Sequence, residues 1–148
     1  MAPGPSTLDS WLQDAPGASL LEAETTLLGE VLDDVFGWEL LQVGLWGPSR
    51  GLIHASRTRQ QTLIAERVVE GVNLVTRLPQ LPIASGTVDA VLLPHTLEFL
   101  PDPKAMIRET DRVLVGEGQL IIVGLRPWSL WGMRSRLSRG RFPPGVRN

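Results

Sequence analysis

Two groups of residues in this chain of 148 could do chemistry, and the first is a set of glycines. Gly44, Gly47 and Gly51 follow an apolar segment, and Glu66 comes 22 residues after Gly44. Glycine lets the backbone approach a ligand closely, and a helix start after such a turn offers free N–H groups to an anion. A carboxylate about 20 residues further on can hold ribose hydroxyls. The spacing is G-x-x-G-x-x-x-G rather than G-x-G-x-x-G, so a tight turn beside a surface glutamate is the alternative interpretation.

The second group centres on His95, which follows an apolar segment at 87–95. Imidazole titrates near neutral pH, so this side chain could serve as a general base or orient a substrate. The alternative is a histidine that forms hydrogen bonds with neighbouring backbone and shapes its loop. For a single histidine without a recognisable partner, that structural role is the one we favour.

Composition excludes several kinds of site. The chain has no cysteine, so disulfides, thiolate catalysis and zinc-thiolate sites are excluded. With two histidines, a histidine-rich metal site is not expected either. No apolar run approaches the roughly 20 residues that cross a bilayer, and the first residues do not resemble a signal peptide. A cytoplasmic location, with no membrane partner, is therefore the expectation.

Charge is distributed unevenly along the chain. Residues 1–49 contain eight acids and no Lys or Arg, whereas residues 126–148 contain six arginines and no acid. A basic segment can bind nucleic acid or an anionic surface. The remaining residues show no basic face and the last part of this segment lacks interleaved aromatics, so a solvated tail is expected and a nucleic-acid partner is not.

The elements that would position these residues follow from hydrophobic periodicity. Helices are predicted at 18–37, 49–56 and 102–114, and buried strands at 39–46, 61–66, 72–77, 87–95 and 119–125. Ser19 and Glu22 would form a capping box for the first helix, and Asp102 with Pro103 would begin the last. Residues 1–17, rich in Pro, Gly and Ser, predict an irregular lead-in.

Strands that alternate with helices over short connections form a parallel sheet covered on both faces. The sequence therefore predicts a doubly wound, mostly parallel α/β domain over 18–125, followed by a basic tail at 126–148. Ligands of such a sheet bind beyond the carboxyl ends of its strands, near the point where the strand order reverses. The glycine loop, Glu66 and His95 each follow a predicted strand and would meet at that edge.

Several segments resemble one enzyme family. LPIASGTVDAV at 81–91 is similar to the LP-F-x-D-x-S-F-D-x-V segment of Rossmann-like (class I) S-adenosylmethionine-dependent methyltransferases, particularly the methyltransferase type 11 group. ETDRVLVGEGQLIIVG at 109–124 matches that group's E-x-x-R-V-L-x-P-G-G pattern. PHTLEF at 94–99 and PWSLWG at 127–132 resemble a bacterial branch of small methyltransferases with PH-x-LEF and NPWSLWG segments. The resemblance covers about residues 17–134.

The resemblance implies an S-adenosyl-L-methionine cofactor and methyl transfer to an acceptor, which we expect to be a small molecule. It also implies roles for particular residues. Those bordering the methionine part of the cofactor would be Gly44, Leu45, Trp46 and Gly47, with Glu66 at the ribose, Arg77 and Leu78 at the adenine, and Pro94 and His95 near the methyl group. His95 is the candidate catalytic residue.

Some positions depart from the family pattern. Gln42 replaces the acid that leads the glycine loop, and Arg77 replaces an acid near the adenine. Trp46 and Pro48 stand where backbone would approach the cofactor, so they would either cover it or block it. The alternative function is therefore a degenerate domain without catalysis, acting as a binding or assembly module.

Two further expectations concern the end of the chain and the acceptor. The last two strands of the fold are apparently missing, which would leave an exposed sheet edge that a homodimer could cover. Methylation of a nucleic acid is less expected, because LPHT stands where amino-methylating enzymes carry [DN]PP[YFW].

Overall fold

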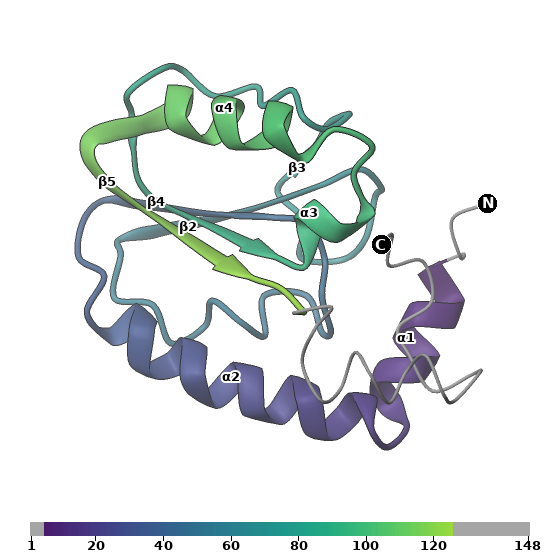
Figure 1. Cartoon of the computed structure of the whole chain (residues 1–148). Helices are drawn as coiled ribbons and strands as arrows, with labels where there is room; N and C mark the ends of the chain where they lie inside the picture. Colours follow the sequence, from purple (N-terminus) through teal and green to yellow (C-terminus); the bar gives the residue numbers. More distant parts are fainter. Residues whose placement is uncertain (1–4, 126–148) are drawn as a thin grey trace.

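A parallel sheet forms the centre of the computed structural model, which describes residues 5–125 (Figure 1). Its strands are β1 (Glu39–Val43), β2 (Gln60–Ala65), β3 (Leu74–Val75), β4 (Val88–Pro94) and β5 (Leu114–Val123). The strand order is β3-β2-β1-β4-β5, and each neighbouring pair is parallel. The order reverses between β1 and β4, which confirms the doubly wound α/β prediction and places the switch point there.

Helices cover both faces of this sheet. They are α1 (Pro5–Gln13), α2 (Gly17–Asp33), α3 (Thr96–Phe99) and α4 (Pro103–Val113). Figure 1 shows α2 beneath the sheet and α4 above it. Alternate residues of the central strands fill the two cores, because successive side chains of a strand point to opposite faces. Leu40 of β1 packs with α2, whereas Leu41 packs on the side of Met106 from α4.

Two segments before and after β1 differ from the sequence prediction. Residues 5–13 form helix α1, although Pro and Gly suggested an irregular lead-in. Residues 49–56 form successive turns and no helix. Arg50 has a left-handed backbone with φ +61°, which interrupts any right-handed helix at that point. The chain after β1 therefore crosses to β2 without the predicted helix.

Helix α2 is shorter than predicted and begins differently. It runs from Gly17, with Pro16 at the N-cap and no side-chain cap, so the predicted capping box at Ser19 was wrong. Its buried face contains Leu28 and Leu32 at a four-residue spacing, and Glu24 continues that spacing toward the N-terminus. Glu24 is thus an acid on the buried face of an otherwise amphipathic helix.

Helix α4 begins as predicted and ends earlier. The Asp102 carboxylate accepts a hydrogen bond of 3.0 Å from the backbone N–H of Ala105, and Pro103 occupies the first turn. The helix ends at Val113, and β5 follows directly instead of beginning after the glycines at 116 and 118. Those glycines lie within an irregularity between the β4 and β5 registers.

Strand β5 is one edge of the sheet formed by the described residues. Ile122 on this strand is 49% exposed. The expected absence of two further strands and the basic tail concern positions beyond residue 125, outside the described residues, and the homodimer stays a prediction. Among the helices described, none is both long and apolar enough to cross a membrane.

Candidate functional site

The glycine loop after β1 lies against the end of β4, at the switch point. Gly44 has φ +100° and Gly47 has φ +69°, conformations that residues with a Cβ rarely adopt. A Cβ on Gly44 would lie 2.5 Å from the Thr96 hydroxyl, which donates a hydrogen bond to the carbonyl of Val43. The backbone of this loop is therefore held close to the start of α3, at the carboxyl ends of the two central strands.

Trp46 points inward from the loop. Its side chain is 1% exposed and packs in the core between the sheet and α2. The expectation that this ring covers or blocks a ligand was wrong, because the ring lies beneath the loop rather than outside it. Gly44, Leu45 and Gly47 remain partly exposed, so the loop presents mainly backbone to its surroundings.

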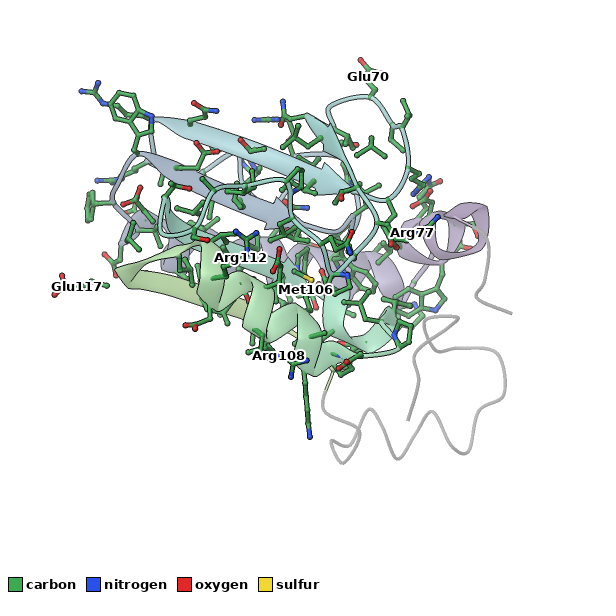
Figure 2. The ribbon with its side chains drawn as sticks, turned by 90° about the horizontal axis from the view of Figure 1, so that it is seen from above. Glu70, Arg77, Met106, Arg108, Arg112 and Glu117 are labelled. Carbon is green, nitrogen blue, oxygen red and sulfur yellow. The ribbon has the colours of Figure 1, made fainter. Side chains whose placement is uncertain are left out.

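The residues predicted for ribose and adenine lie together at the ends of β2 and β3. Glu66 is exposed, and its carboxylate accepts a hydrogen bond of 2.9 Å from the backbone N–H of Leu78. Arg77 is also exposed. Figure 2 shows Arg77 near the arrowhead end of the strands and Glu117 at the opposite end. The structure thus places Glu66 and Arg77, the residues predicted for ribose and adenine, at the same edge of the sheet as the glycine loop.

His95 is enclosed immediately after β4, with its side chain 0% exposed. Nε2 lies 2.6 Å from a carboxylate oxygen of Glu24, and Nδ1 lies 2.9 Å from one of Glu98. Burial alone would lower the pKa of this ring, but the hydrogen bonds from Glu24 and Glu98 and their charges outweigh burial and raise it to about 9. A base needs an accessible, unprotonated nitrogen, so this geometry fits the structural role favoured from the sequence better than the candidate catalytic role of His95.

Sequence reasoning did not identify Glu24 or Glu98 as the partners of His95. Glu24 accepts hydrogen bonds from both His95 and the indole N–H of Trp46. One signal was available, because Glu24, Leu28 and Leu32 share one helix face. A carboxylate on a buried face needs a partner, and His95 is a cation candidate at the expected end of the sheet.

Gln42 occupies the position of the family's leading acid and is fully buried in β1. Its amide nitrogen donates to the carbonyl of Gly44 at 2.9 Å, whereas its Oε1 has no hydrogen-bond partner among the described residues. Buried polar atoms are rarely left unpaired. The side chain of Gln42 therefore places a hydrogen-bond acceptor without a partner next to the glycine loop.

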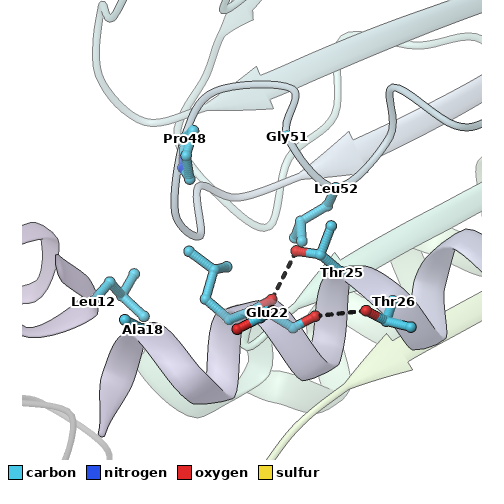
Figure 3. A pocket seen from close by; sticks show the side chains of 9 residues that line it. Leu12, Ala18, Glu22, Thr25, Thr26, Pro48, Gly51 and Leu52 are labelled. Atoms are coloured by element: carbon cyan, nitrogen blue, oxygen red, sulfur yellow. Dashed lines mark hydrogen bonds between the residues drawn. The ribbon is translucent and has the colours of Figure 1, made fainter. Parts of the chain in front are cut away.

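A cavity of about 390 Å³ opens beside the loop, between α1, α2 and the turns after Gly47 (Figure 3). Its walls are mostly apolar, with Leu12 and Leu21 on one side and Pro48 and Leu52 on the other. The hydroxyl of Thr25 donates to a carbonyl within α2, as Figure 3 shows, so the apolar character dominates. The size falls in the range of small-molecule sites.

Known proteins share both sequence and fold with this chain. Residues 48–122 match the family described as methyltransferase domain. Protein Rv2003c of Mycobacterium tuberculosis (strain H37Rv) is 30% identical over 95% of this chain and 50% of its own length. Protein YafS of Escherichia coli K12 is 48% identical over 54 residues, which are 36% of this chain and 22% of YafS. The chain thus spans about half the length of the mycobacterial relative, and its match to YafS covers 22% of that protein.

A structural relative agrees with this assignment. The crystal structure of a SAM-dependent methyltransferase from Aquifex aeolicus superimposes with a TM-score of 0.60 and 20% identity, over 96% of this chain and 79% of the other. At this identity the likeness shows the fold alone. Together with the family match and the strand order, it shows that this chain belongs to the methyltransferase domain family and has the Rossmann-like fold of class I methyltransferases.

Proposed function

We propose that the chain binds S-adenosyl-L-methionine at the carboxyl ends of β1, β2 and β4 and transfers its methyl group to a small-molecule acceptor. The observation that carries this proposal is the placement of two candidate groups at one edge of the sheet. The glycine loop follows β1 at the switch point, and Glu66 follows β2 beside Leu78. Sites in doubly wound sheets occur at this position.

The residues present fit such a cofactor. The unpaired Oε1 of Gln42 can accept a hydrogen bond from an ammonium group, although the acid usual at this position would also carry charge. The exposed carboxylate of Glu66 can accept from ribose hydroxyls, and Leu78 offers an apolar side chain for the adenine. Gly44, Leu45 and Gly47 would border the methionine part, and Pro94 would lie near the methyl group.

S-adenosylmethionine supplies a methyl group on a sulfonium, which is already a good leaving group. The protein then has to hold the acceptor in line with the methyl carbon and exclude water, and such positioning provides much of the rate enhancement. No base among the described residues is required for an acceptor that is already nucleophilic. The burial of His95 is consistent with a reaction that uses no side-chain base.

The cavity beside the loop supports a small, largely apolar acceptor. It adjoins Pro48, which directly follows the last glycine proposed to border the cofactor. Its one carboxylate belongs to Glu22, on an exposed part of α2. We therefore propose this cavity as the place where part of the acceptor binds.

Calorimetric titration with S-adenosylhomocysteine tests the proposal. Wild-type protein should show saturable binding, and Glu66→Gln should weaken it roughly ten- to a hundredfold, since a ribose contact to a charged group contributes roughly 1.5–3 kcal/mol. Glu70→Gln is the matched control, because Glu70 is an exposed carboxylate on the loop that follows β2. Absence of saturable heat at millimolar ligand would refute the proposed enzyme and favour the non-catalytic binding or assembly module.

A further inference from the structure

Glu24, His95, Glu98 and Trp46 form one connected cluster beneath the proposed cofactor edge. The two oxygens of Glu24 are used separately: one lies 2.6 Å from His95 Nε2, and the other accepts from the Trp46 indole N–H at 2.7 Å. The indole and imidazole rings also stack, with centroids 3.9 Å apart. Glu24, Trp46 and His95 each contact the other two, and Glu98 joins them through His95, so a movement of any one of the first three side chains disturbs the other two.

This cluster joins segments that are far apart in the sequence. Glu24 belongs to α2 and Trp46 to the loop after β1, and His95 directly follows β4. Glu98, on α3, also accepts a hydrogen bond of 2.7 Å from the backbone N–H of Leu125, just beyond β5. The four side chains therefore connect one covering helix to the carboxyl ends of three strands.

Opposite two ionised carboxylates, the imidazole would have to donate from both nitrogens, since each faces a carboxylate oxygen. A neutral imidazole has one donor and one acceptor, and the acceptor would face a carboxylate without a proton between them. Protonation resolves this conflict, and the raised pKa of His95 agrees with it. Of the ionisable side chains in the described residues, Glu24 and Glu98 are the two that face the ring.

His95 also holds an unusual backbone conformation. Its φ is +53°, in the left-handed region, a conformation that is unfavourable for a residue other than glycine. Its N–H donates to the carbonyl of Val123 at 2.8 Å. The cluster and this hydrogen bond together hold the turn at the end of β4, and that turn places Thr96 against Gly44.

We propose that Glu24 is a positioning residue of the cofactor site, holding the loop after β1 and the turn after β4 in one fixed relative geometry. The proposal rests on the proposed function, because both held segments border the edge where S-adenosylmethionine would bind. Glu24 acts through Trp46 and His95 and does not touch the cofactor itself. A displacement of about 1 Å in either segment would misplace groups that must bind one ligand together.

The first test compares two glutamine variants of α2. Glu24→Gln keeps the side-chain shape and removes the charge, whereas Glu30→Gln changes an exposed carboxylate on the same helix. In calorimetry with S-adenosylhomocysteine, at a temperature where circular dichroism shows folded protein, Glu24→Gln should bind about tenfold more weakly. Glu30→Gln should match the wild type, and equal affinity of the two variants would overturn the proposal.

A spectroscopic readout separates positioning from general stability. Nitrogen-15 NMR of the His95 ring at pH 7.5 should show both nitrogens protonated in the wild type and an altered ring in Glu24→Gln. Trp46→Phe removes the indole donor and keeps an aromatic ring, so it should weaken ligand binding while leaving His95 protonated. A neutral ring in the wild type, or full ligand affinity in Trp46→Phe, would contradict the inferred role.

The cluster can also be tested if the wild type binds no cofactor, an outcome that defeats the proposed function. Exchange of the Trp46 indole proton with solvent deuterium should then be slow in wild type and Glu30→Gln and markedly faster in Glu24→Gln. Such a result would retain Glu24 as the residue that fixes the loop. Equal exchange rates of the indole proton in all three proteins would show that Glu24 does not fix the loop either.

Discussion

His95 carries its proton well above neutral pH in the folded protein, so the folding free energy depends on pH. The pKa of the ring is about 9 when folded, against an ordinary value of 6.5. The folded state therefore binds the proton more tightly than the unfolded chain does. The stabilisation is fully present below pH 6.5 and is lost as pH rises through 9.

We expect the free energy of unfolding to fall between pH 6.5 and pH 9, and the shift corresponds to an upper limit of roughly 3 kcal/mol. Urea unfolding across this range measures it. His95→Gln should be less stable at pH 6.5 and should lose most of this pH dependence. His54→Gln changes the exposed histidine, and this variant should keep the pH dependence of the wild type. A His95→Gln variant that shows the wild-type slope would assign the effect to other groups.

At the scale of elements, the strands and their parallel arrangement were predictable because nearly continuous apolar runs mark buried parallel strands. The start of α4 was predictable from Asp102 and Pro103, whose side chains act locally. Helix α1 and the absence of a helix at 49–56 were not predictable, because tertiary packing determines the conformation of such short segments. The role of Glu24 depends on a contact with a residue 71 positions away, which periodicity does not reveal.

The loop after β1 and the start of α3 are elements in close contact, and a glycine substitution tests that contact. Gly44→Ala would place a Cβ 2.5 Å from the Thr96 hydroxyl on a backbone with φ +100°. We expect it to lower the free energy of unfolding by about 1–3 kcal/mol. Gly29→Ala, within α2 and with no atom near its Cβ, should raise it by about 0.5–1 kcal/mol. Urea denaturation measures the two opposite changes in the free energy of unfolding. An unchanged free energy of unfolding in Gly44→Ala would show that the contact with Thr96 relaxes easily.

At the scale of the whole molecule, the proposed site is made from segments between residues 42 and 98 that folding brings to one sheet edge. α2 contributes to it indirectly, because Glu24 reaches the ends of β1 and β4 from the covering layer. Resemblance of motifs indicated most of the loops that we propose for the site. It did not indicate Glu24, because the matched motifs concern the loops and strands rather than the preceding helix.

A ligand that needs the assembled edge should stabilise the entire fold. A ligand bound only by the folded state adds RT ln(1 + [L]/Kd), which is about 2.7 kcal/mol when its concentration is 100 times Kd. For a domain of this size, such a gain raises Tm by several degrees, and we expect S-adenosylhomocysteine to produce this shift in thermal unfolding followed by circular dichroism. Glu66→Gln should need a higher ligand concentration for the same shift, whereas Glu70→Gln should follow the wild type. A Tm independent of ligand concentration would show that the folded edge does not bind this ligand, because binding to the folded state alone must raise its stability.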